Sequence, residues 1–215
     1  MLTLLHNVSV YYQDGDDIMM SADKKLKILI KENKGFITYE ELKKNQISYA
    51  SIHGLISQGR LITEERGIYQ LPEVYLDEYY ALQHRFSKGV FSMETALWLH
   101  GLTLTVPNEV VMTFPYGTNT KTIKSAGVKP VILRSNYFGG VMDLIRINGQ
   151  KIKVYEQERV LAECLRNIYD LDVQIIAPAF KIYVEKGNVD YSKLLKYAKM
   201  FKVEKKVQSY LEVLV

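Results

Sequence analysis

The sequence predicts an α+β protein: an N-terminal winged helix-turn-helix domain joined to a larger mixed α/β domain with a helical C-terminus. Helix and strand patterns follow one another in a characteristic order over residues 22–72. Asn148-Gly149 lies between two alternating strand patterns, and amphipathic helical patterns fill the chain after Tyr155. A chain of 215 residues, with 47% hydrophobic and 24% charged residues, is long enough for two folded domains.

The first part of the chain reads as three short helices. Residues 22–33 mix apolar side chains with lysines at helical spacing. After a brief extended stretch, Thr38 with Glu41 predicts a capping box at the start of a second helix. Ser48 caps a third helix, which Gly59 ends.

Two predicted strands follow the third helix. Residues 60–63 and 67–71 are short and apolar, and Gly67 in the turn between them is free to take a positive φ. The order helix, strand, helix, helix, strand, strand is that of a winged helix-turn-helix. In that arrangement the third helix enters the major groove of DNA and the hairpin lies along the backbone.

Beyond Pro72 the pattern changes. Residues 73–87 predict an aromatic-rich linking helix, and Ser92 caps a helix that stops at Gly101. Strand-like runs then cover 109–114, 130–135 and 142–155, the last a hairpin with a type I′ turn at Asn148-Gly149. The remaining predicted helices are 156–168, 172–187, 190–201 and 204–215. We expect Pro178 to kink the second of these or to end its first turn.

These patterns give the predicted domain boundaries. Residues 1–21 are expected to be a flexible or adventitious extension, with Met19 or Met20 as the natural start, because they lack the basic start and apolar core of a secretory signal. The DNA-binding domain is 22–72, the linking helix 73–87, and the C-terminal domain 88–215.

Composition excludes several functional classes. The single cysteine, Cys164, allows no internal disulfide and fits a reducing cytoplasm. No apolar run approaches the roughly 18 residues of a membrane span. The four histidines lack metal-ligand spacing, and no phosphate-binding glycine loop or nucleophile motif is present. We therefore expect a cytoplasmic protein that is not an enzyme and uses no cofactor or metal.

The third helix and its flanks carry the predicted DNA contacts. Residues 22–70 hold nine basic against six acidic groups, a mildly basic balance. Serine, histidine and tyrosine can contact base edges and phosphates, although this helix has no arginine, the strongest reader of guanine. The residues predicted to contact DNA are Lys43, Lys44, Ser48, Tyr49, Ser51, His53, Ser57, Arg60 and Arg66. The alternative is a small helical domain used for protein contacts.

A second basic feature lies near the C-terminus. Its lysines are Lys193, Lys196, Lys199, Lys202, Lys205 and Lys206. Three-residue spacing places the first of them along one stripe of a helix, where they could hold DNA, RNA or an acidic protein. The alternative is the solvated face of an amphipathic helix.

Three stretches of the sequence, taken in order, are similar to segments of one known family. The first is LISQGRLITEERGIYQL, matched through Leu55, Gly59, Leu61, Gly67 and Tyr69. The second is FSMETALWLHGL, matched through Ser92, Ala96, Leu97, His100, Gly101 and Leu102, followed by Pro107 and EVVMTFP. The third is VYEQERVLAECLR. Through these stretches the chain resembles the AbiEi family, the antitoxins of the abortive-infection type IV toxin–antitoxin systems, over about residues 22–215.

The resemblance implies that the two domains have different functions. The N-terminal winged helix would bind repeated operator DNA and repress its own operon. Because one copy with few phosphate contacts binds weakly, we expect cooperative or dimeric binding to neighbouring half-sites. The C-terminal domain would counteract a nucleotidyltransferase-type toxin without forming a stable complex with it. The six C-terminal lysines are then candidates for the antitoxin surface.

Two other functions remain open. In one, a winged-helix regulator senses a small ligand in a C-terminal pocket lined by Tyr75, Tyr79, Tyr80, Phe86 and Trp98. In the other, the protein is a nuclease that uses the mixed sheet. The pair Glu204 and Lys206 is similar to a fragment of a nuclease motif.

Overall fold

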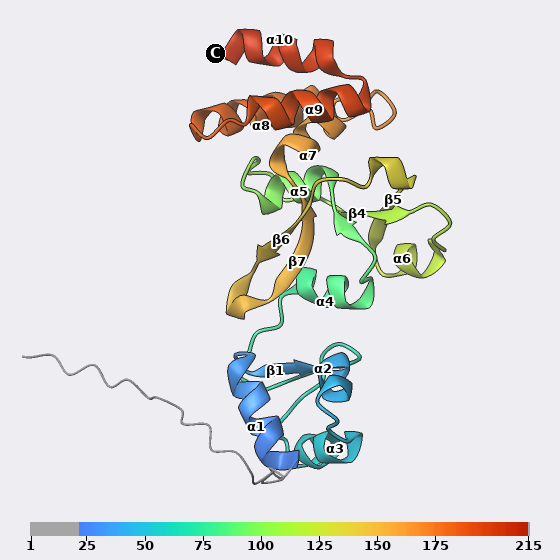
Figure 1. Ribbon diagram of the computed structural model, residues 1–215, viewed down its shortest axis with the longest axis vertical. Helices are drawn as coiled ribbons and strands as arrows, with labels where there is room; N and C mark the ends of the chain where they lie inside the picture. The colour runs from blue at the N-terminus through green and yellow to red at the C-terminus, as the bar shows by residue number, and fades with distance from the viewer. Residues whose placement is uncertain (1–21, 215) are drawn as a thin grey trace, which may run out of the picture. The chain divides into compact units, whose positions relative to one another are not determined.

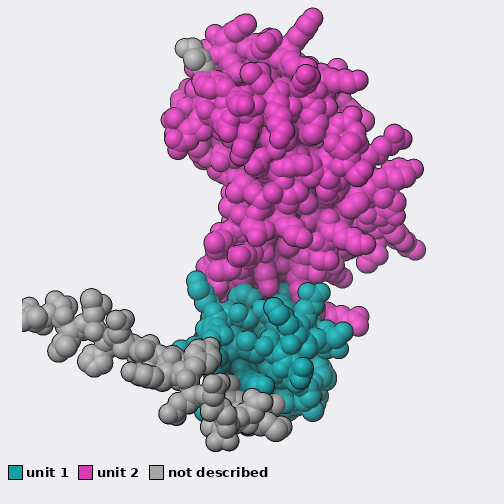
Figure 2. Space-filling model, viewed as in Figure 1, with its two compact units in different colours: residues 1–63, 67–72 teal, residues 64–66, 73–215 magenta. Residues whose placement is uncertain are grey.

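The structure, a computed structural model, describes residues 22–214 (Figure 1). The predicted extension 1–21 lies outside the described residues. The described chain forms two compact units, residues 22–63 with 67–72 and residues 64–66 with 73–214 (Figure 2).

The first unit has the element order of a winged helix. Its elements are α1 (Ala22–Glu32), β1 (Phe36–Thr38), α2 (Tyr39–Lys44), α3 (Tyr49–Ser57) and β2 (Ile68–Gln70). Strands β1 and β2 pair antiparallel, in a register that places Ile37 opposite Tyr69. The buried core of this unit is Leu26, Ile30, Ile37, Leu42, Ile47, Ile52, Leu61 and Tyr69.

The hairpin of the first unit is shorter than predicted. Of the strand expected at residues 60–63, only Ile62 pairs, exchanging two backbone hydrogen bonds with Gln70 of 2.8 and 3.0 Å. The N–H groups of Arg60 and Leu61 both donate to the carbonyl of Leu55, at 2.9 and 3.3 Å, and so close the end of α3. Because these two N–H groups are bonded to the end of α3, they cannot also bond to a neighbouring strand.

The second unit is a mixed five-stranded sheet covered by helices. Its elements are α4 (Glu78–Arg85), β3 (Val90–Phe91), α5 (Met93–Leu99), β4 (Val110–Pro115), α6 (Lys121–Ser125), β5 (Val128–Leu133), β6 (Val141–Ile145), β7 (Lys151–Tyr155), α7 (Gln157–Cys164), α8 (Val173–Glu185), α9 (Tyr191–Phe201) and α10 (Glu204–Leu214), with single 3-10 turns at Ser135–Tyr137 and Ile147–Gly149.

The strands run in the order β5-β4-β3-β7-β6. The pairs β4–β5 and β3–β7 are parallel, whereas β3–β4 and β6–β7 are antiparallel. Helices α7 to α10 gather beyond one end of this sheet, with α5 lying between it and α7 (Figure 1). The α+β class predicted from the sequence is confirmed, with its helical C-terminus.

The hairpin β6–β7 turns where the sequence predicted. Asn148 has φ 56° and ψ 21°, and Gly149 has φ 75°. The N–H of Gln150 donates to the carbonyl of Ile147 at 3.1 Å. Two consecutive residues with positive φ, closed by this bond, make the expected type I′ turn.

Two predicted helices differ from those observed. The helix expected over 156–168 ends at Cys164, where the N–H groups of Leu165 and Arg166 bond three residues back instead of four. Ile168, expected on the apolar face, is 75% exposed. Helix α8 continues through Pro178, so the proline does not end its first turn, and the kink expected there stays a prediction.

Helix α4 belongs to the second unit. Asp77 caps it by accepting from the N–H groups of Tyr79 and Tyr80. The Arg146 guanidinium pairs with Asp77 at 3.0 Å, and the N–H of Lys153 donates to Gln83 at 2.8 Å. These contacts attach the predicted linking segment to the β6–β7 hairpin.

Candidate nucleic-acid interface

Helix α3 is set off from α2 by a tight turn. Gln46 takes a left-handed φ of 56°, and the N–H of the buried Ile47 donates to the carbonyl of Leu42 at 3.0 Å. Ser48 then caps α3, its hydroxyl accepting from the N–H of Ser51 at 3.4 Å. Four residues, 45–48, therefore separate the end of α2 from the start of α3.

The two faces of α3 differ in chemistry. Ile52 is fully buried and Leu55 is partly buried against the core. On an adjacent face Tyr49 is 52% exposed, with its ring 6.3 Å from that of the buried Tyr69, and His53 and Ser57 follow at four-residue intervals, both exposed. Helix α3 thus presents a short polar and aromatic face to solvent.

The predicted polar contacts on this face are not equivalent. The hydroxyls of Ser48 and Ser51 face each other at 3.2 Å, and that of Ser57 donates to the carbonyl of His53 at 2.8 Å. These three hydroxyls already have partners within the helix. The phenol of Tyr49 and the imidazole of His53, whose rings lie 6.2 Å apart, are better placed to meet a ligand.

Cations flank the same helix. Lys43 and Lys44 are exposed in the last turn of α2, and Arg60 is exposed just after α3. Arg66 is exposed in the turn before β2, a turn that groups with the second unit. Within residues 22–214 none of these four forms an ion pair, so their charges are available to phosphates.

Sequence reasoning missed one position on this face. Ala50 is exposed beside Tyr49 and His53, and an alanine methyl can pack on the methyl group of thymine. Its three-residue spacing from His53 was the signal that could have identified it.

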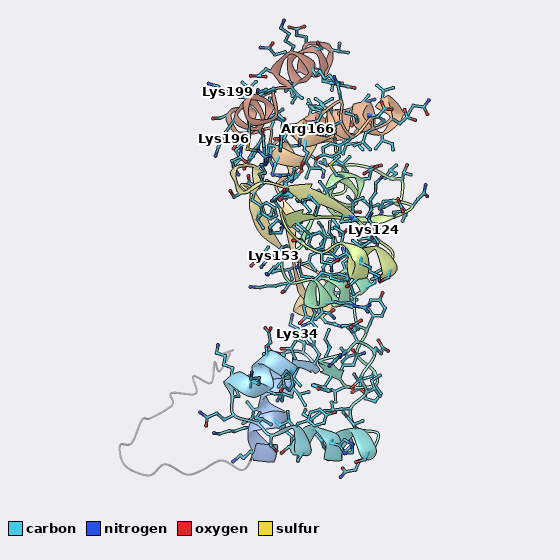
Figure 3. All side chains as sticks on the ribbon, turned by 90° about the vertical axis from the view of Figure 1, so that its right-hand side faces the viewer. Lys34, Lys124, Lys153, Arg166, Lys196 and Lys199 are labelled. Atoms are coloured by element: carbon cyan, nitrogen blue, oxygen red, sulfur yellow. The ribbon has the colours of Figure 1, made fainter. Side chains whose placement is uncertain are left out.

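The six C-terminal lysines are exposed, but they fall into two groups. Lys193 pairs with Glu156 at 2.9 Å, and the ammonium of Lys206 donates to the carbonyl of Leu165 at 2.7 Å and to the amide oxygen of Asn167. Lys196 and Lys199 project from α9 (Figure 3). Lys202 follows the end of α9, and Lys205 lies in the first turn of α10.

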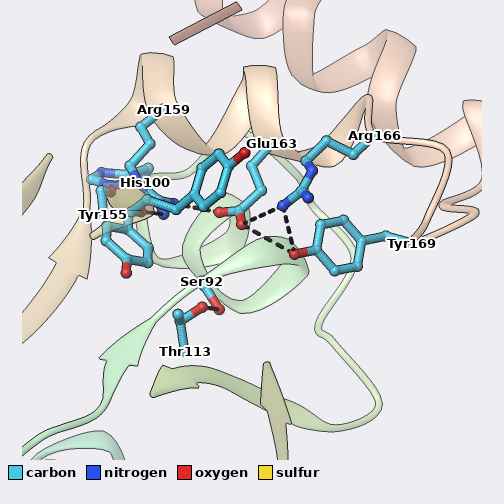
Figure 4. Close-up of polar contacts among 9 residues, drawn as sticks. Ser92, His100, Thr113, Tyr155, Arg159, Glu163, Arg166 and Tyr169 are labelled. Carbon is cyan, nitrogen blue, oxygen red and sulfur yellow. Dashed lines mark hydrogen bonds and ion pairs between the residues drawn. The ribbon is translucent and has the colours of Figure 1, made fainter. Parts of the chain in front are cut away.

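A buried ionic cluster underlies this surface (Figure 4). Arg159 and Glu163 are fully buried and bonded to each other, and the Arg159 guanidinium lies 3.2 Å from the centre of the Tyr155 ring. Glu163 also accepts from Tyr169 at 3.3 Å and lies 3.8 Å from Arg166. The four-residue spacing of Arg159 and Glu163 was the sequence signal for this pair.

His100 has a structural role in the second unit. Its Nε2 lies 2.7 Å from the carbonyl of Tyr155 and so donates to it. Burial lowers the pKa of His100, with the Lys186 ammonium acting in the same direction, so the ring is neutral near pH 7.

Four of the five aromatic residues proposed to line a ligand pocket, all except Tyr75, pack instead with the core. Tyr79 is 4% exposed, meets Phe91 edge to face and stacks on Trp98. Phe86 meets Phe114 edge to face at 6.2 Å. Tyr75 is 60% exposed. The packing of these rings therefore does not favour a shared ligand pocket.

Comparison with known proteins yields a fold and no family. Neither protein-family models nor curated proteins match the chain. Among solved structures it is similar to the RV2827C protein from Mycobacterium tuberculosis, with a TM-score of 0.53 and 13% identity, over 89% of this chain and 80% of that one. At that identity the similarity supports the fold alone.

The described residues hold neither a membrane-spanning helix nor a metal-binding cluster. No helix within residues 22–214 is both long enough and apolar enough to cross a bilayer. The same part of the chain holds no cluster of three or more His, Cys, Asp or Glu side chains arranged to bind a metal ion.

Proposed function

We propose that the protein is a DNA-binding transcriptional autorepressor in the cytoplasm and the antitoxin of a type IV toxin–antitoxin system. The observation that carries the DNA-binding part is the exposed face of α3. Tyr49 and His53 are exposed on this helix. The cations Lys43, Lys44 and Arg60, which form no ion pair within residues 22–214, flank it. A polar helix face between cations is the pattern that meets a major groove and its phosphates.

The small number of cations limits what one copy can do. Three phosphate contacts would give a slope of about −2.7 in log affinity against log salt, and non-specific dissociation constants of such domains are about 10⁻⁴–10⁻⁶ M. Specific repression therefore needs two copies on neighbouring half-sites, which would roughly double the slope. An inverted or direct repeat in the upstream DNA is the expected operator.

A gel-shift titration with the upstream fragment tests this part. The double variant Tyr49→Ala/His53→Ala should lose operator preference and keep weak binding to unrelated DNA. Lys43→Ala should weaken both equally and reduce the salt slope by about 0.9 per copy bound. Ser57→Ala is the matched control on the same face, because its hydroxyl is already bonded to the backbone of His53.

The DNA-binding proposal fails if no fragment is retarded at low salt. It fails equally if Tyr49→Ala/His53→Ala and Ser57→Ala behave alike. Retardation that depends only on Lys196 and Lys199 would move the nucleic-acid surface to the second unit.

Support for the antitoxin part comes from the resemblance to the AbiEi family. Co-expression with a neighbouring nucleotidyltransferase tests it, and growth should recover when the second unit alone is supplied. The fragment should begin at residue 73, because α4 contributes the buried Tyr79 and Gln83 to this unit and a start at residue 88 would remove them. Residues 1–72 alone should give no protection.

Within the second unit, Lys196 and Lys199 are the first antitoxin positions to test. Both are exposed on α9 without an ion pair in the described chain, whereas Lys193 is held by Glu156. Lys196→Glu/Lys199→Glu should abolish protection from the toxin, and the distant Lys121→Glu should not. Equal protection by both variants would exclude this face of α9.

A further inference from the structure

Two hollows meet at the loop that follows α7. The first, about 470 Å³, lies between residues 166–168 and the turn from α9 to α10, residues 201–206. The second, about 350 Å³, lies against α8 and α10. Both are lined by Arg166, Asn167 and Lys206, so they form two halves of one groove.

The first hollow is basic. Four of its lining residues are cations, Arg166, Lys202, Lys205 and Lys206, against a single carboxylate, Glu204. The Lys206 ammonium is held at the rim by its bonds to Leu165 and Asn167. A positioned cation costs less to engage than one on a mobile side chain.

Arg166 is also positioned with donors to spare. Its Nη1 donates to the Tyr169 hydroxyl at 3.1 Å and lies 3.8 Å from Glu163 (Figure 4). Its guanidinium carbon lies 5.2 Å from the ring centres of both Tyr169 and Phe201 and 5.6 Å from that of Tyr137. Its Nε and Nη2 make no hydrogen bond within residues 22–214, so they remain available to an anion.

Lys202 occupies a backbone position that favours glycine. It ends α9 with φ 58° and ψ 44°, and the N–H of Val203 bonds back to the carbonyl of Ala198 at 2.9 Å. The left-handed region costs stability for every residue with a Cβ. The chain therefore keeps a lysine beside the basic hollow at a position where glycine would be more stable.

The second hollow has a different lining. Leu171, Ile176 and Tyr210 give it an apolar and aromatic wall, and Tyr210 stacks on Phe180 with ring centres 4.7 Å apart. Asp170 and Ser209 add polar groups at its edge. An apolar wall next to a cluster of cations suits a ligand with a planar apolar part and a polyanionic part.

We propose that this groove binds a nucleoside phosphate, with its phosphates among Arg166, Lys202 and Lys205 and its base against Leu171 and Tyr210. Guanidinium and ammonium groups are the usual phosphate ligands of proteins. An acidic peptide would fill the basic hollow but would leave the apolar wall without a partner. The site goes beyond DNA binding and toxin neutralisation, and requires neither.

Calorimetric titration of the full-length protein with ADP, GDP, CDP and UDP at low salt tests the proposal. At least one should bind with a dissociation constant below about 1 mM, and inorganic pyrophosphate should compete more weakly. A short single-stranded RNA is the second arm. Binding of that RNA without any free nucleotide would support the site and assign its phosphates to a strand.

Two variants separate ligand contact from folding. Lys202→Gly should weaken binding about tenfold while raising the midpoint of thermal unfolding by about 2 °C, because glycine relieves the left-handed backbone. Lys205→Ala should weaken binding by a similar factor without stabilising the protein. Lys121→Ala, an exposed lysine on α6 outside both hollows, should bind like the parent.

Several results would overturn the proposal. One is the absence of binding by every nucleotide and by the RNA at about 1 mM. Another is unchanged affinity in Lys202→Gly. Pyrophosphate binding as tightly as the best nucleotide would remove the role of the apolar hollow. Displacement of the nucleotide by oligo-glutamate at equal concentration would show an acidic-peptide site instead.

Discussion

The core cluster of the first unit is aliphatic apart from Tyr69, whereas the second unit buries the Arg159 guanidinium and three carboxylates, those of Asp77, Glu158 and Glu163. Lys43, Lys44 and Arg60 of the first unit are exposed, so a ligand can reach their charges. Arg159, Glu163 and Glu158 are committed to holding the second unit together. The comparison shows that basic composition alone does not locate a binding surface, because only the positions of the charges separate the two roles.

The largest effect should come from breaking the buried pair. Glu163→Ala leaves Arg159 buried without its counter-charge and should cost about 3–5 kcal/mol of the free energy of unfolding. Trp98, the only tryptophan of the chain, lies in the second unit and reports its unfolding in urea.

Lys181→Ala is the matched control for this pair. It removes a pair with Glu185 of the same four-residue spacing, whose side chains are 64% and 62% exposed, and should cost less than about 0.5 kcal/mol. The double variant Arg159→Met/Glu163→Leu should recover much of the loss. Equal effects for Glu163→Ala and Lys181→Ala would mean that burial is not what matters.

Two glycines allow a sharper test of packing around the same cluster. A Cβ at Gly140, which has φ 80°, would meet the Tyr197 hydroxyl at 2.5 Å and Cδ of Arg159 at 2.9 Å. Gly127 has φ 75° and open space at the same point. Gly140→Ala should cost about 3 kcal/mol, strain plus overpacking, and Gly127→Ala only about 1. Urea unfolding followed by Trp98 fluorescence measures the stability loss of each variant. Similar losses for the two would contradict the close contacts described at Gly140.

In the first unit a smaller loss should come from removing a helix cap. The Thr38 hydroxyl accepts from the N–H of Glu41 at 3.3 Å, and the Glu41 carboxylate accepts from the N–H of Thr38 at 2.8 Å. Thr38→Ala should cost about 1 kcal/mol. Amide hydrogen exchange of β1 and β2 measures it. Ser48→Ala, whose capping bond is the longer 3.4 Å, should cost less, and the reverse order would contradict this account.

The smallest effect concerns the pH dependence of a surface pair. Burial acts to raise the pKa of Glu156, but hydrogen bonds from Tyr197 and Lys193 outweigh it, and the net shift is downward. A carboxyl group whose pKa is lowered by folding stabilises the fold at pH values above its ordinary pKa, near 4.5. This contribution is lost as the pH falls through the lowered pKa.

Lys193→Ala should therefore cost at most about 0.5 kcal/mol at pH 7 and less at pH 3. Unfolding curves at the two pH values measure this difference, with Lys121→Ala as the reference. A larger cost at the lower pH would reverse the sign and exclude the pair as its source.

The sequence predicted most of the first unit because its signals are local. Thr38 and Ser48 cap helices where expected, and Asn148-Gly149 in the second unit forms the expected turn. The helix that ends at Cys164 was predicted to run to residue 168. Its true end was missed because the hydrogen bond from Arg166 to Tyr169, just after the helix, depends on side-chain packing. The groove at Arg166 and Lys206 could not be predicted, since it joins four separate segments.

Strand β3 is only two residues long, yet it holds the centre of the sheet. It pairs with β4 through Val90 and Phe91, and with β7 through Phe91 and Val154 alone. The β6–β7 hairpin can close in microseconds, whereas this long-range contact requires a large loop to close first. During synthesis on a ribosome, β3 must therefore wait for β7 to emerge, and until then the nascent chain carries an open sheet edge.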